Sequence, residues 1–165
     1  MVVVVAFVAW LIFRDSGDDN NTPQGPNSSA ASVQQLRSVS EETGQPIYWA
    51  GRRADYTYEL TRTTDGNVYI RYLPPGTAVG AQQPNYLTIV TYPRRRAERG
   101  LKRIARRQGS VSFDIPDNGF AVYSRARPNS VYVAYPGEDV QVEIYDPNAR
   151  RARNLARDGR VRPIT

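Results

Sequence analysis

The chain has neither cysteine nor histidine among its 165 residues. The absence of cysteine excludes disulfides, thiol nucleophiles, thiolate metal sites and a lipidated N-terminal cysteine, and it leaves the redox compartment undecided. Together the two absences remove the common zinc ligands, the Ser-His-Asp and Cys-His arrangements and the usual general base at neutral pH. We therefore predict a protein that is not an enzyme, with no catalytic residues, no metal site and no cofactor.

Carboxylates are the side chains that remain for acid–base chemistry. Glu59 and Glu143 occupy alternating positions of expected strands, opposite the apolar side chains, so we expect both to face solvent. The sequences Asp117-Asn118-Gly119 and Gly137-Glu138-Asp139 are typical of turns. A cell-wall hydrolase that uses two carboxylates stays open as the least favoured function.

Lysine is nearly absent as well, because Lys102 stands alone against 21 arginines in a chain of net charge +6. Genome composition can produce such a bias, so the position of the charge is more informative than its amount. Fourteen of the 22 basic residues lie in segments 94–107 and 150–162. They are either a solvated surface or a site for an anionic partner. The candidate contacts are Arg95, Arg99, Lys102, Arg103, Arg106, Arg150, Arg153 and Arg157.

A long apolar run occurs only at the N-terminus, from Met1 to Phe13, and polar residues follow from Arg14 onward. Thirteen helical residues cover about 20 Å, less than the ~30 Å of a bilayer core. We expect residues 1–14 to belong to a transmembrane anchor that starts further upstream; a buried strand is the alternative. Residues 15–31 are predicted to be a flexible linker, and residues 32–165 an extracytoplasmic domain.

The domain is expected to begin with a short helix. Ser32 and Gln35 have the spacing of a capping box, Leu36 and Val39 continue an apolar stripe, and Gly44 marks the C-terminal end.

Two segments of the domain resemble each other. The pattern V-Y-[I/V]-x-Y occurs at residues 68–72 and again at 131–135. Each copy has a strand before it and a strand followed by a helix after it, in units 56–109 and 119–159. The expected strands cover 56–63, 68–72, 86–92, 120–125, 131–135 and 140–145, with turns at Asp65-Gly66 and near Pro128-Asn129.

The helix of each unit has one apolar stripe, made by Ala97, Leu101, Ile104 and Ala105 in the first and by Ala149, Ala152, Leu155 and Ala156 in the second. We therefore predict an α+β fold with two layers: a mainly antiparallel sheet built from two βββα-like repeats, with the helices on one face. Both helices would then contribute to a single positive patch.

Aromatic residues supply a second candidate surface. Tyr48 and Trp49 follow the first helix and are predicted to fill core space or to line a ligand pocket. Tyr69 and Tyr132 are related by the repeat, and we expect them on a sheet face that the helices leave exposed.

The sequence P-I-Y-W-A-G at 46–51, together with the V-Y-[I/V]-x-Y strands, resembles uncharacterised bacterial membrane-anchored proteins over about residues 32–164. The resemblance implies an architecture and no activity. The favoured function is an extracytoplasmic, membrane-tethered, non-enzymatic interaction domain that binds a protein, an anionic lipid or a wall polymer. A sensory domain for a small ligand is the alternative. Nucleic acid is a partner only if the domain is cytoplasmic, and the oligomeric state is left open.

Overall fold

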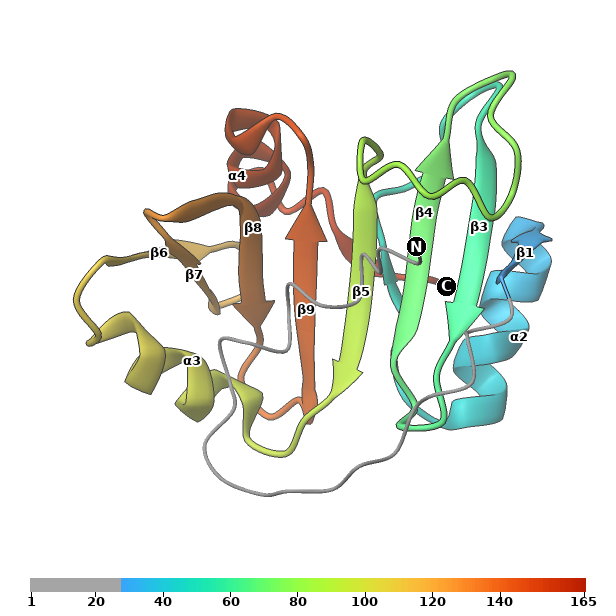
Figure 1. Ribbon diagram of the computed structural model, residues 1–165. Helices are drawn as coiled ribbons and strands as arrows, with labels where there is room; N and C mark the ends of the chain where they lie inside the picture. The colour runs from blue at the N-terminus through green and yellow to red at the C-terminus, as the bar shows by residue number, and fades with distance from the viewer. Residues whose placement is uncertain (1–27) are drawn as a thin grey trace, which may run out of the picture.

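An eight-stranded antiparallel sheet forms the centre of the domain, and three helices pack on it (Figure 1). The computed structural model describes residues 28–165; the predicted anchor and the linker up to residue 27 lie outside the described residues. From one edge to the other the strands are β1 (Ser28–Ala31), β3 (Thr57–Arg62), β4 (Val68–Leu73), β5 (Thr88–Pro93), β9 (Val140–Tyr145), β8 (Arg127–Ala134), β7 (Gly119–Ser124) and β6 (Ser110–Ile115).

The last strands of the two expected units meet in the middle of the sheet. β5 pairs with β9 in antiparallel register, so that Ile89 lies opposite Ile144. The remaining strands follow outward in the same sequence on both sides, β4 and β3 on one and β8 and β7 on the other. The prediction of an α+β fold with a mainly antiparallel sheet is confirmed.

Two edge strands lie outside the expected units. β1 occupies the end of the predicted linker and pairs with β3, and β6 pairs with β7. The turn expected near Pro128-Asn129 is wrong, because β8 already includes both residues and the chain turns at Arg125-Ala126. The register between β7 and β8 shifts between Val122 and Ser124. A proline is tolerated at such an irregularity because a regular ladder bond is already missing there.

The first helix, α2 (Val33–Thr43), has the predicted ends. The Ser32 side chain accepts a hydrogen bond from the Gln35 backbone amide, and the Gln35 side chain accepts one from the Ser32 amide. Gly44 closes the helix in the left-handed conformation, at φ 63°. Because a capping box and a C-terminal glycine are local signals, sequence alone was sufficient to place both ends.

The other two helices, α3 (Ala97–Ala105) and α4 (Ala149–Arg157), cover opposite faces of the sheet. Leu155 of α4 belongs to the main core with Val131 and Val133, whereas Leu101 of α3 packs with Tyr132, whose side chain points to the other face of β8. The prediction that the helices share one face is therefore wrong, and they cannot form a single positive patch. Because the two helices lie on opposite faces, the arginines of α3 and the arginines of α4 are on different sides of the sheet.

A small two-stranded sheet packs against the large one at β5, where the Tyr48 amide donates to Thr91 Oγ1 at 3.0 Å. It consists of β2 (Tyr48–Trp49) and β10 (Arg162–Pro163), which pair antiparallel. The Ile164 amide donates to the Ile47 carbonyl oxygen at 2.8 Å, which extends the pairing by one more bond. This contact brings the end of the chain against the segment that follows α2. Within residues 28–165, no helix is long and apolar enough to cross a membrane.

Candidate functional site

A buried carboxylate lies on the sheet face that α3 partly covers. Glu143 is only 5% exposed, and its carboxylate accepts hydrogen bonds from the hydroxyls of Tyr92 (2.6 Å), Ser130 (2.7 Å) and Tyr132 (3.3 Å). The sequence-based prediction placed the Glu143 side chain on the correct face of the sheet but expected it to be exposed to solvent. It is wrong about exposure, because neighbouring side chains on the same face surround the carboxylate.

Burial raises the pKa of the Glu143 carboxyl above its ordinary value of 4.5, although the three hydroxyl donors act in the opposite direction. Compared with the unfolded chain, the folded state therefore shifts the equilibrium of this carboxyl toward its protonated form. Burial and the Glu143 carboxylate also raise the pKa values of Tyr92 and Tyr132 above 10.0, so both tyrosines stay protonated donors at neutral pH. The cluster is a polar network inside the fold.

The raised pKa of Glu143 predicts a specific dependence of stability on pH. Its contribution is fully present below pH 4.5 and is lost as pH rises toward the folded-state pKa, with a slope of up to about 1.4 kcal/mol per pH unit. Glu143→Gln keeps a carbonyl acceptor and removes the titration. We expect the difference in unfolding free energy between variant and parent, measured by urea denaturation, to grow with pH above 4.5. A difference that stays constant with pH contradicts this assignment.

Glu59 is the second carboxylate that was expected in solvent, and it is also buried, at 1% exposure. It accepts hydrogen bonds from Arg71 Nη1 at 2.6 Å and from the Gly80 amide at 2.5 Å. The second guanidinium nitrogen of Arg71 donates to the carbonyl oxygens of Ala81 and Gln83. The Glu59–Arg71 pair therefore holds the β4–β5 loop against the sheet. The two charges neutralise each other, so neither is available to a ligand.

The two tyrosines at matching positions of the V-Y-[I/V]-x-Y segments, Tyr69 and Tyr132, do share a face of the sheet, as predicted, but they do not form an exposed surface. Tyr132 is buried beneath α3, and Tyr69 is half-buried with its ring edge-on to Tyr92 at a centroid distance of 6.3 Å. Both belong to the surroundings of Glu143. A sheet surface open to a partner is not present at Tyr132.

The basic residues of α3 are exposed, and most have no counter-charge among residues 28–165. Its apolar residues recur at positions 97, 101, 104 and 105 and face the sheet, so Arg99, Arg103 and Arg106 project from the other side of the helix. Within the described chain these three make no ion pair, and neither does Arg95 in the preceding turn. Lys102 differs, because its Nζ lies 2.6 Å from the Glu98 carboxylate.

The arginines predicted on α4 are in part held by the protein itself. The guanidinium groups of Arg153 and Arg157 lie over the rings of Tyr123 and Phe113, at 5.4 and 4.8 Å from the ring centroids. Arg150 is exposed. Of the eight basic candidates, the four on or next to α3 that lack a carboxylate partner within the described chain are therefore the most available to a ligand.

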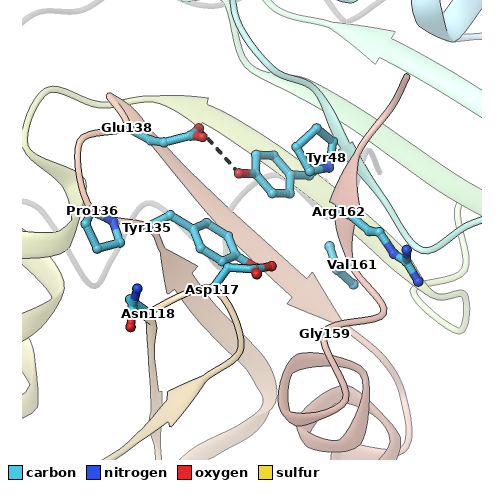
Figure 2. A pocket seen from close by; sticks show the side chains of 10 residues that line it. Tyr48, Asp117, Asn118, Tyr135, Pro136, Glu138, Gly159, Val161 and Arg162 are labelled. Carbon is cyan, nitrogen blue, oxygen red and sulfur yellow. Dashed lines mark hydrogen bonds between the residues drawn. The ribbon is translucent and has the colours of Figure 1, made fainter.

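A concave pocket lies where the small sheet meets two turns of the large one. It has a volume of about 350 Å³. Its walls come from four segments of the chain: Tyr48 from β2, Asp117 from the β6–β7 turn, Tyr135 and Glu138 from the β8–β9 connection, and Arg162 from β10 (Figure 2).

The two tyrosine rings of this pocket are stacked, with centroids 5.6 Å apart and planes 10° from parallel. The Tyr48 hydroxyl donates to Glu138 Oε2 at 3.3 Å, and Figure 2 shows the Asp117 carboxylate beside the Tyr135 ring. Burial, followed by the charges of Asp117 and Glu138, raises the pKa of Tyr135 to about 12. The Asp117 and Glu138 carboxylates therefore both lie close enough to the stacked tyrosines to raise their pKa values.

Tight packing of a turn holds Tyr135 in place. Asp117 and Asn118 both have positive φ, 59° and 56°, which forms the tight turn predicted at this position. A Cβ on the following residue, Gly119, would lie 2.7 Å from a Tyr135 ring carbon. Only glycine at position 119 leaves room for the ring.

Sequence reasoning identified only one of the pocket's polar residues as a ligand contact. Tyr48 lines the pocket, but Trp49 does not; it packs against Tyr58 in the main core at a centroid distance of 6.0 Å. Asp117 and Glu138 were recognised only as turn residues, and Tyr135 only as the end of a strand. No group of three or more His, Cys, Asp or Glu side chains in residues 28–165 is arranged to hold a metal ion.

Comparison of the chain with protein-family models, with curated proteins and with solved structures found no match. The interpretation of the chain's function therefore depends on its own residues and their geometry.

Proposed function

We propose that this chain is a membrane-tethered, non-enzymatic binding domain whose α3 surface contacts the phosphate groups of anionic lipids. The observation that carries the proposal is that four of the exposed arginines on and next to α3 lack a counter-charge within the described chain and project from the helix or the turn before it: Arg95, Arg99, Arg103 and Arg106. A guanidinium group donates two parallel hydrogen bonds to a phosphate, which makes arginine well suited to this contact.

The sequence supports a membrane rather than a soluble polyanion as the source of the phosphate. The apolar run Met1–Phe13 is the reason for proposing an anchor, and the polar stretch after it would allow the domain to approach the lipid surface. A domain tethered in this way meets lipid headgroups at a high local concentration. The proposed location is the extracytoplasmic side of a cell membrane.

We also propose that units 56–109 and 119–159 derive from one βββα repeat. The support is the mirrored strand order, in which β5 and β9 are neighbours and β3 and β7 are the outermost strands of the two units. The helices do not follow that symmetry, because α3 and α4 cover opposite faces of the second unit. If the two units arose by duplication, the direction of the chain between β5 and α3 must have changed afterwards.

Binding of the full-length protein to lipid vesicles tests the proposed function. The parent is compared with the triple variant Arg99→Gln, Arg103→Gln, Arg106→Gln, on vesicles of phosphatidylcholine alone and with added phosphatidylglycerol. Each basic residue near an anionic surface contributes about 1 kcal/mol, so we expect the triple variant to bind the charged vesicles about a hundredfold more weakly. Binding to neutral vesicles should not change, because the N-terminal segment is the same.

A matched control removes three exposed arginines elsewhere: Arg52→Gln, Arg150→Gln and Arg160→Gln. It has the same net charge as the α3 variant, so equal losses in both variants would show a non-specific charge effect and would contradict the proposal. Equal affinity of the parent for soluble poly-glutamate would contradict it too, because the contact would then be with carboxylates of an acidic protein.

A further inference from the structure

The pocket of Tyr48, Asp117, Tyr135, Glu138 and Arg162 lies on a protein of net charge +6 and is nevertheless lined by two carboxylates and one basic residue. In Figure 2 the Arg162 side chain points away from Glu138. The arrangement differs from the α3 surface in the sign of its charge and in its shape. It requires a separate explanation.

We propose that this pocket binds a small organic cation that carries a primary ammonium or guanidinium group. The carboxylates of Asp117 and Glu138 supply the charge, and the partly exposed ring of Tyr135, stacked on the buried ring of Tyr48, supplies an aromatic wall. A cation gains from both, through charge-assisted hydrogen bonds and through the negative face of an aromatic ring. The proposal does not depend on the lipid-binding function, because the two surfaces share no residue.

The protein's own bonds leave capacity for such a ligand. Among residues 28–165, Tyr48 is the one donor to the Glu138 carboxylate, at 3.3 Å, and that bond uses a single oxygen. The Asp117 side chain has no hydrogen bond or ion pair within residues 28–165. Each carboxylate therefore retains acceptor positions that an ammonium or guanidinium donor can fill.

The size and construction of the pocket set an upper limit on the ligand. A volume of about 350 Å³ lies at the lower end of the range for small-molecule sites. The pocket is held by the β2–β10 pairing, the stacked rings and the tight turn before Gly119. Because these contacts fix its shape before a ligand arrives, little ordering would be needed on binding.

Titration of the full-length protein with agmatine, which has an ammonium group at one end and a guanidinium group at the other, tests the proposal. Nuclear magnetic resonance follows the backbone amides of residues 48, 117, 118, 135 and 138. We expect saturable shifts at these positions with a dissociation constant of about 1 mM, as is reasonable for so small a ligand. Putrescine reports on ammonium alone and methylguanidine on guanidinium alone.

Two variants, Asp117→Asn and Glu138→Gln, remove the charges while they preserve the local structure. Asparagine tolerates the left-handed backbone that Asp117 adopts, and a glutamine carbonyl can still accept the hydrogen bond from Tyr48, so both variants should fold. We expect each to weaken agmatine binding about tenfold, the loss of one charged contact. Asp114→Asn is the matched control, an exposed carboxylate on β6 that does not line the pocket.

Three results would overturn the proposal: no saturable shift at the pocket, equal affinity of the three variants, or tighter binding of acetate than of agmatine. The last result would assign the pocket to an anion held by Arg162. Failure here leaves the vesicle experiment unaffected, since that experiment concerns the arginines of α3.

Discussion

Arg71→Met is expected to destabilise the domain by about 3 to 5 kcal/mol, the usual cost of leaving one charge of a buried pair without its partner. The Glu59 side chain is 1% exposed and that of Arg71 14%. Without the guanidinium, the carboxylate would retain the Gly80 amide as its donor, and the Ala81 and Gln83 carbonyl oxygens would lose theirs. Urea denaturation followed by circular dichroism measures the loss.

Two further variants separate the buried charge from other effects. Glu59→Gln combined with Arg71→Met removes both charges, and we expect it to recover a large part of the lost stability. Arg62→Met breaks an ion pair with Glu42 whose side chains are 46% and 60% exposed, so it should cost less than about 1 kcal/mol. Equal losses for Arg71→Met and Arg62→Met would show that the buried pair is not important for stability.

Gly119→Ala is expected to have the second largest effect, a loss of about 1 to 3 kcal/mol from overpacking. The new Cβ would meet Ile115 Cγ1 and a Tyr135 ring carbon at 2.7 Å, and the ring cannot withdraw without losing its stacking on Tyr48. Near-ultraviolet circular dichroism should report the displaced tyrosines, and thermal unfolding the lost stability.

Gly100→Ala is the matched control for this substitution. Gly100 lies inside α3, and a Cβ there meets nothing within 4 Å. Because alanine is the better helix former, we expect a gain of about 0.5 to 1 kcal/mol. A Gly119→Ala protein as stable as the parent, with an unchanged tyrosine spectrum, would contradict the packing described for the pocket.

Local signals in the sequence predicted the individual elements well. The capping box of α2, the Asp65-Gly66 turn and the strand at 140–145 all have the expected positions, since each depends on residues close together in the chain. β6 was missed although Ser110 to Ile115 alternates between small or polar and larger apolar side chains. That alternation is the ordinary signal of a strand with one buried face.

The faces of the helices could not be predicted because they depend on distant contacts. Arg96, just before α3, adopts a left-handed backbone at φ 55°, and its amide donates to Asp139 Oδ1 at 2.8 Å. The Arg94 amide donates to the Asp139 carbonyl oxygen at 2.7 Å. The β8–β9 turn thus holds the start of α3 on the face opposite to α4, and no pattern near Arg96 indicates this.

The candidate pocket could not be predicted from local sequence patterns either. Its residues lie at positions 48, 117, 135, 138 and 162; the β2–β10 pairing brings the first and last of these together, and the pairing of β6, β7 and β8 brings their turns beside them. The burial of Glu143 has a similar origin, because its hydroxyl donors come from the two neighbouring strands, β5 and β8. Sequence alternation identified the face of the sheet on which Glu143 lies but not what would cover it.

The pairing of β5 with β9 at the centre of the sheet also has a consequence for how the domain folds. Ile89 lies opposite Ile70 of β4 on one side of β5, but its partner on the other side is Ile144, which lies more than one unit further along the chain. Until Ile144 is available, β5, with Ile89, Val90 and Thr91 in sequence, is an unprotected edge rich in β-branched residues. We expect slow folding, dominated by distant contacts, and a period in which the first half is prone to aggregate or needs a chaperone.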